Sequence, residues 1–172
     1  MAQAPGRRTR ADPLRGMPEL MAGLDADEIR PKLWLGSRDA AVKREALVAL
    51  GITHVLSAGS EFPRRLGIEG LEGDAEDFGG RRVKTKSSVE QVYLGRAGNV
   101  DPFVRLCVSL DDVKGADITQ HFDACEEFIS EGIAAGGVLV HCSHGRSRSA
   151  AIVAAFLMRK EKLATASALL SV

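Results

Sequence analysis

The sequence predicts an α/β fold in which helices flank a central, mostly parallel sheet. Segments typical of strands and of helices alternate from residue 29 onwards, which is the pattern of parallel sheets covered by helices. The wholly apolar segment 138–140 precedes a run at 150–158 that is apolar on nearly every face. A strand and a helix of this composition are buried, because neither has a polar face to turn towards water. We therefore expect residues 141–149 to connect a central strand to a central helix.

The composition is that of one globular domain without a charge bias. The chain has 172 residues, 45% of them apolar, which is enough for one substantial core. Its 23 basic and 23 acidic residues give a formal net charge of zero, so no overall field attracts nucleic acid or an anionic membrane. The apolar runs are too short to span a bilayer. We expect no nucleic-acid partner and no membrane span, and any anion-binding site must be local.

The three cysteines, Cys107, Cys125 and Cys142, are odd in number and widely spaced. They form no CxxC pair, which argues against a disulfide framework and against a zinc site. A reducing compartment, the cytoplasm or the nucleus, is therefore expected. Cys107 and Cys125 are interpreted as packing residues.

Residues 1–28 are predicted to form a disordered basic tail, and residues 29–172 the folded domain. Four arginines lie among Pro and Gly residues in the first twenty positions. An organelle transit peptide is the alternative. It is less favoured, because serine is absent from these positions and acidic residues are present.

Short periodic segments predict the first elements of the domain. Residues 33–35 are expected to form a strand, and the next segment a helix with one apolar face. Gly51 is placed to end that helix, since glycine readily adopts the left-handed conformation. A second strand is expected at 52–56, which is rich in β-branched residues. The apolar helix face comprises Val42, Ala46, Leu47 and Leu50.

The middle of the chain shows much less pattern. Between residues 61 and 100, glycines and charged residues interrupt every apolar period. An irregular and partly disordered insertion is therefore expected there. Residues 91–94 are its one candidate strand.

Regular patterns return after this insertion. Residues 104–108 are predicted to form a strand, and 109–115 a polar loop. The following helix is expected to begin with a capping box made by Asp117 and Gln120. Its apolar face comprises Ile118, Phe122, Cys125, Ile129 and Ile133.

Residues 141–149, His-Cys-Ser-His-Gly-Arg-Ser-Arg-Ser, are predicted to bind a phosphate group. A loop between a strand's carboxyl end and a helix N-terminus has free N–H groups and a helix dipole that favour anions. Gly145 permits close backbone approach, so that successive N–H groups can converge on phosphoryl oxygens. Arg148 can turn its guanidinium fork onto two of those oxygens. The predicted phosphate-binding residues are Ser143, His144, Gly145, Arg146, Ser147 and Arg148.

The same field favours the thiolate form of Cys142, because the pKa of a cysteine falls near cations and at helix N-termini. A thiolate is a nucleophile, and we expect Cys142 to attack the phosphorus atom. Ser149 can donate a hydrogen bond to the sulfur, and His141 would fix the strand end by hydrogen bonds to loop carbonyls. Asp112 is chosen as the general acid that protonates the leaving oxygen, with Asp111 as its competitor.

The pattern His-Cys-x5-Arg-Ser at 141–149 resembles the signature of protein tyrosine phosphatases, and specifically that of the dual-specificity phosphatase family. Residues 29–37 resemble the entry strand of that family, and 50–56 its second strand. Residues 109–118 resemble its acid loop, and this likeness places the family's general acid on Asp112. The match runs from about residue 29 to residue 170 and leaves the insertion outside.

The resemblance implies a protein tyrosine phosphatase-like fold and a cysteine-dependent phosphatase. Such an enzyme hydrolyses phosphoserine, phosphothreonine and phosphotyrosine in proteins through a cysteinyl-phosphate intermediate, without a metal or other cofactor. Its partner would be a phosphorylated protein in signalling. In the family, two more helices follow the motif helix, whereas this chain stops at Val172. The C-terminal helices are therefore expected to be truncated, leaving an apolar face that supports self-association.

Two other functions stay open. One is dephosphorylation of a non-protein substrate, such as an inositol lipid, a glucan or an RNA 5′ end. Arg146 supports it by attracting a second phosphate, but the paired lysines of lipid-type relatives are absent. The other is a catalytically weak module that binds phosphoproteins. The missing C-terminal helices favour this module, and the intact Cys142, Arg148 and Asp112 argue against it.

Overall fold

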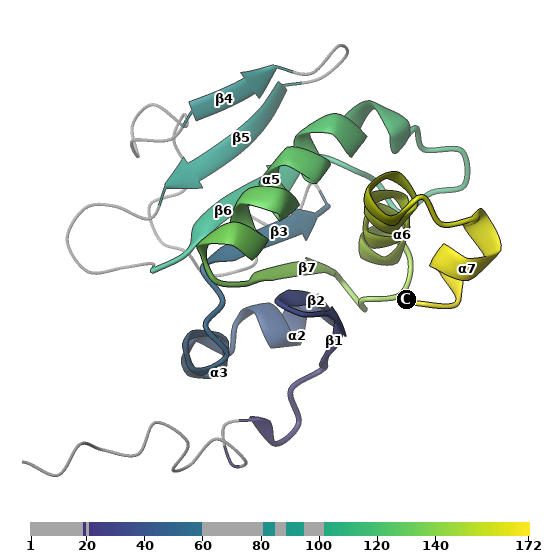
Figure 1. The fold of residues 1–172 in the computed structure, drawn as a ribbon. Helices are drawn as coiled ribbons and strands as arrows, with labels where there is room; N and C mark the ends of the chain where they lie inside the picture. Colours follow the sequence, from purple (N-terminus) through teal and green to yellow (C-terminus); the bar gives the residue numbers. More distant parts are fainter. Residues whose placement is uncertain (1–18, 20, 60–80, 85–88, 95–101) are drawn as a thin grey trace, which may run out of the picture.

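The structure is a computed structural model that describes residues 19, 21–59, 81–84, 89–94 and 102–172. Its strands form one sheet in the order β1-β2-β7-β3-β6-β5-β4, with β7 between β2 and β3 (Figure 1). The elements in chain order are β1 (Ala26–Arg30), β2 (Leu33–Ser37), α2 (Arg38–Ala41), α3 (Arg44–Ala49), β3 (His54–Ala58), β4 (Arg81–Lys84), β5 (Val89–Leu94), β6 (Val104–Val108), the 3-10 helix η2 (Thr119–His121), α5 (Phe122–Ala135), β7 (Val138–Cys142), α6 (Arg148–Glu161) and α7 (Thr165–Leu169).

The four central strands, β2, β7, β3 and β6, run parallel, which confirms the predicted fold class. At one edge β1 pairs antiparallel with β2, and at the other β5 and β4 continue antiparallel beyond β6. Cys142 of β7 lies opposite Ser37 of β2, and His141 lies opposite Ser57 of β3. The register therefore brings the carboxyl ends of three strands together beside the predicted phosphate loop.

Side chains that alternate along β7 divide the core into two layers. Val138 and Val140 belong to the larger cluster, which the helices α5 and α6 complete. Leu139 points to the opposite face and packs in a second cluster with Leu47 of α3 and Val55 of β3. All five side chains are fully buried. The strand that carries the nucleophile is thus held on both faces as well as along both edges.

The folded domain begins earlier than the predicted boundary. Residues 26–28, assigned to the disordered tail by the sequence, are the first residues of β1. Their side chains are mostly exposed, so the sequence has no apolar pattern there from which a strand could be predicted. Backbone pairing with β2 holds these residues in the sheet instead. Residues 1–18 and 20, the greater part of the predicted tail, lie outside the described residues.

The segment 61–100 is not irregular throughout, which corrects the expectation for it. β5 includes the candidate strand at 91–94, and it pairs with both β6 and β4. The sequence of β4, Arg-Arg-Val-Lys, lacks the alternation of apolar and polar residues that predicts a strand. Basic residues are typical of strands at the edge of a sheet. Residues 60–80, 85–88 and 95–101 lie outside the described residues.

The predicted helix before Gly51 is two short helices, α2 and α3, with a break at Lys43. Ala46 and Leu47 are buried as expected, but Val42 is 53% exposed because the break turns it away from the core. Gly51 has a φ of 72°, so the predicted left-handed stop is confirmed.

The predicted capping box before α5 takes a different form. The Asp117 carboxylate accepts a hydrogen bond from the Thr119 N–H at 3.0 Å. The Gln120 side chain donates to the Asp117 carbonyl, rather than accepting from its N–H as a capping box requires. A 3-10 turn, η2, therefore precedes α5. Within the described part of the chain, neither α5 nor another helix is long and apolar enough to cross a bilayer.

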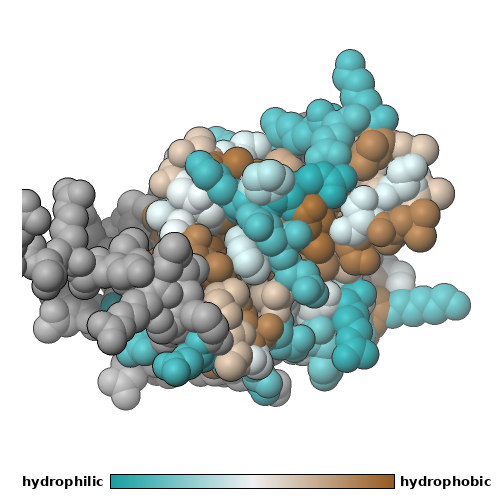
Figure 2. All heavy atoms as spheres, turned by 60° about the horizontal axis from the view of Figure 1, so that its bottom comes forward, coloured by the Kyte–Doolittle hydropathy of each residue, from teal (hydrophilic) through white to brown (hydrophobic). Residues whose placement is uncertain are grey.

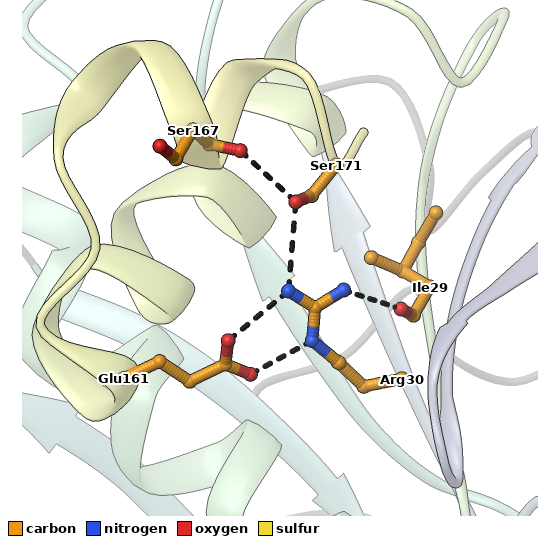
Figure 3. A network of polar contacts seen from close by, with 5 residues as sticks. All are labelled: Ile29, Arg30, Glu161, Ser167 and Ser171. Carbon is orange, nitrogen blue, oxygen red and sulfur yellow. Dashed lines mark hydrogen bonds and ion pairs between the residues drawn. The ribbon is translucent and has the colours of Figure 1, made fainter.

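The C-terminal segment packs on α6 and is tied to β1. Ala168 of α7 is fully buried, so α7 covers part of the face that was expected to be exposed. Arg30 makes a bidentate ion pair with Glu161, at 2.9 and 3.0 Å, and also reaches Ser171 at 3.5 Å (Figure 3). Leu169 and Leu170 stay exposed, and Figure 2 shows hydrophobic surface at the end of the molecule where α7 lies.

Replacing Leu139 by alanine should destabilise the fold by about 2–5 kcal/mol, because it opens a cavity behind the central strand. Urea unfolding followed by circular dichroism measures the loss. The matched control is Val48→Ala in α3, where the side chain is 52% exposed and the expected change is within about 0.5 kcal/mol. Equal effects of the two substitutions would contradict the two-layer core.

Candidate active site

The predicted phosphate loop connects the end of β7 to the first turn of α6. Cys142 is the last residue of β7, and Arg148 is the first residue of α6. In the first backbone hydrogen bond of the helix, the Ala151 N–H donates to the Ser147 carbonyl. The N–H groups that precede it have no partner within the helix, so they are available to a group at its N-terminus.

The middle of this loop, at Gly145, packs closely against the backbone of β2. Gly145 has a φ of 72°, and a Cβ atom there would lie 2.8 Å from the carbonyl oxygen of Gly36. Gly36 is constrained in turn, because a Cβ atom on it would lie 2.8 Å from the Cβ atom of Ala26. Gly145 is therefore required for the loop to close against β2, and Gly36 for β2 to lie close to β1.

Cys142 is 2% exposed, and hydrogen-bond donors surround its sulfur atom. The Ser149 hydroxyl donates to Sγ at 3.1 Å, and the backbone N–H groups of Ser149, Ser147 and His144 donate to it as well. Burial raises the pKa of this thiol, but the four donors outweigh burial and bring the pKa down to about 7. A large fraction of Cys142 is therefore thiolate at neutral pH.

The other two cysteines lie in different environments. Burial raises the pKa of Cys107 to about 11, so its thiol stays protonated. Cys125 is buried in the larger core cluster, as its interpretation as a packing residue predicts. Of Cys107 and Cys142, only Cys142 is thus ionised near neutral pH.

Arg148 lies across the loop with its guanidinium group buried. Nη2 donates to the Ser143 hydroxyl at 2.9 Å, and Nη1 donates to the Leu110 carbonyl at 3.2 Å. Nη2 also lies 3.7 Å from Oδ2 of Asp112. The loop after β6 and the phosphate loop therefore hold the guanidinium group from two sides, which orients it before any ligand binds.

Asp112 reaches this cradle from the loop that follows β6. Its Oδ1 atom accepts a hydrogen bond from the Ser147 hydroxyl at 3.0 Å, while its side chain is 52% exposed. These contacts place the carboxylate beside Arg148 at the mouth of the loop. The role of Asp112 as the general acid, with Asp111 as its competitor, stays a prediction.

His141 is fully buried and connects the loop to the neighbouring strand. Its Nε2 atom lies 2.7 Å from the Ser57 hydroxyl of β3, and its Nδ1 atom 3.4 Å from the carbonyl oxygen of Cys142. Burial lowers the pKa of His141 to about 3, so the ring is neutral at physiological pH. The contact with a loop carbonyl was expected, whereas the contact with Ser57 was not, since the predicted second strand ends at residue 56.

The side chains of His144 and Arg146 are exposed. Together with Asp25 and Asp27, they line a cleft of about 290 Å³. Of the two, His144 still contributes its backbone N–H to Cys142. Binding of phosphate by these two side chains stays a prediction.

Residues 33–172 match the family model described as the dual specificity phosphatase catalytic domain. The chain belongs to the dual specificity phosphatase family. A probable dual specificity protein phosphatase of Dictyostelium discoideum is 31% identical over 134 residues, covering 78% of this chain and 47% of the relative. Human dual specificity protein phosphatase 26 is 35% identical over 135 residues, covering 77% and 51%. This dual specificity phosphatase chain thus spans about half the length of these two relatives.

Solved structures share the fold of this chain. Human DUSP28 superposes with a TM-score of 0.60 at 23% identity, covering 86% of this chain and 78% of that one. The human tyrosine phosphatase-like serine/threonine/tyrosine-interacting protein gives a TM-score of 0.59 at 24% identity, with coverages of 87% and 82%. At these identities the likeness shows the fold alone.

The buried neutral His141 makes stability depend on pH. Its pKa is depressed in the folded state to about 3, so below about pH 6.5 the unfolded chain binds a proton that the native protein does not. The free energy of unfolding should fall by about 1 kcal/mol between pH 6.5 and 5.5 from this residue alone. Urea titrations at both pH values should show this loss in the parent chain and lack it in His141→Asn.

The matched control is His144→Asn, because that side chain is exposed. The variant should keep the pH dependence of the parent chain. An unchanged pH dependence in His141→Asn would show that the ring is not held neutral by burial.

Proposed function

We propose that this chain is a cysteine-dependent protein phosphatase that acts on phosphoserine, phosphothreonine and phosphotyrosine. The observation that carries the proposal is the environment of Cys142, whose sulfur receives four hydrogen bonds and has a pKa of about 7. Arg148 and Asp112 converge on the same loop. A nucleophile, an anion-binding group and an acid therefore lie within one cradle.

In the first step, the thiolate of Cys142 attacks the phosphorus atom in line with the leaving oxygen. The S–P bond forms, the P–O bond breaks, and Asp112 donates a proton to the leaving oxygen. The backbone N–H groups of the loop and the Arg148 guanidinium group would bear the charge on the phosphoryl oxygens.

In the second step, water attacks the phosphorus atom of the cysteinyl-phosphate. Asp112, now ionised, takes a proton from the water, and the P–S bond breaks. The Ser149 hydroxyl, 3.1 Å from Sγ, stabilises the sulfur as it regains its negative charge. Phosphate then leaves and the thiolate is restored.

Exposure around the loop supports a shallow pocket that is open to all three phosphorylated side chains. His144, Arg146 and Ser147 are exposed at its rim, and Asp112 is half-exposed. The three free thiols and the need for a reduced Cys142 support a reducing compartment, the cytoplasm or the nucleus. Self-association through the exposed Leu169 and Leu170 stays a prediction.

Hydrolysis of 4-nitrophenyl phosphate, without metal and with a reductant, tests the mechanism. The parent chain should turn over and Cys142→Ser should not, because the hydroxyl is a far weaker nucleophile. Asp112→Asn should lower kcat by about 10²-fold, the lower end of the range for loss of a general acid, because 4-nitrophenolate leaves readily without a proton. Cys125→Ala is the matched control for removal of a thiol and should retain turnover.

Phosphopeptides then test the substrate class. Turnover of peptides containing each of the three phosphorylated residues supports the proposal. Hydrolysis of phosphoinositide, phosphoglucan or RNA 5′ phosphate with no hydrolysis of peptides would identify a non-protein phosphatase. A folded parent chain that binds phosphopeptides but is as inactive as Cys142→Ser would instead be a binding module.

A further inference from the structure

Ser147 makes two different contacts with the active site. Its backbone N–H donates to the sulfur of Cys142, whereas its side-chain hydroxyl donates to Oδ1 of Asp112 at 3.0 Å. The sequence predicts Ser147 only as a phosphate-binding residue. In the structure its hydroxyl is directed to the candidate acid instead.

The two oxygens of the Asp112 carboxylate have different surroundings. Oδ1 is bound by Ser147, and Oδ2 lies 3.7 Å from Nη2 of Arg148. Because Arg148 is the side chain that would bind the phosphoryl group, Oδ2 lies on the side of the carboxylate where that group would bind. Oδ1 faces the start of α6.

The carboxylate depends on this anchor because its contact with Arg148, at 3.7 Å, is longer than a hydrogen bond. The Asp112 side chain is 52% exposed and lies on a loop, where its rotamers would otherwise be free to interconvert. A hydroxyl group has a single proton to donate, so it selects one oxygen. That selection leaves the other oxygen in one defined orientation.

We propose that Ser147 is a positioning residue that anchors Oδ1 of Asp112, so that Oδ2 carries the proton to and from the reacting oxygen. The inference rests on the proposed function. In the first step, the S–P bond forms, the P–O bond breaks and the proton on Oδ2 passes to the leaving oxygen. In the second, water forms the new O–P bond, the P–S bond breaks and the water proton passes to Oδ2. Ser147 keeps its hydrogen bond to Oδ1 throughout.

Leaving-group dependence tests this role, because an alkyl leaving group needs the proton far more than 4-nitrophenolate does. In Ser147→Ala, the ratio of kcat on an alkyl phosphate to kcat on 4-nitrophenyl phosphate should fall about tenfold, since small errors in position are costly for proton transfer. Ser147→Thr keeps the hydroxyl and should restore most of the ratio. Inhibition by inorganic phosphate should be unchanged in both variants, because the backbone N–H is retained.

A double-mutant cycle shows whether Ser147 acts through Asp112. In an Asp112→Ala background, Ser147→Ala should change the ratio no further, because the oxygen that it anchors is gone. Additive effects would overturn the inference. So would an unchanged ratio with weaker phosphate inhibition, which would identify the hydroxyl as a phosphate ligand. A parent chain without any turnover would defeat the proposed function itself, and the inference would fail with it.

Discussion

Four hydrogen bonds converge on the sulfur of Cys142, and the rest of the site depends on them. They are supplied by a loop that can close only because Gly145, which has no Cβ atom, lies against the backbone of β2. The loop in turn needs a strand fixed on both edges and a helix that begins directly after it, which β7 and α6 provide. The fold thus places the N-terminus of a helix at a buried thiol.

A comparison of two cysteines in the same chain shows what decides reactivity. Cys107 and Cys142 both experience burial, which raises the pKa of each thiol. For Cys107 burial prevails and the pKa reaches about 11. For Cys142 the donors of the loop prevail and the pKa falls to about 7. Reactivity therefore follows from the donors at the helix N-terminus, and burial alone would suppress it.

The sequence could predict those parts of the site that lie close together along the chain. Cys142, Gly145, Arg148 and Ser149 fall within eight residues, so their spacing fixes their geometry once a strand precedes and a helix follows. The contact between Ser57 and His141 could not be predicted, because it depends on the register between β3 and β7. The break at Lys43 and the strand β4 were missed for a related reason, since tertiary packing and backbone pairing determine them rather than a side-chain period.

The most direct test of this account is the pH dependence of alkylation of each cysteine by iodoacetamide in the folded chain, followed by mass spectrometry. Only the thiolate reacts, so the rate at each site reports its ionisation. The account predicts half-maximal reactivity of Cys142 near pH 7, with Cys107 unreactive up to pH 9 because its pKa is about 11. A midpoint for Cys142 near pH 9, its ordinary value, would show that the loop does not stabilise a thiolate, and the proposed mechanism would lose its basis.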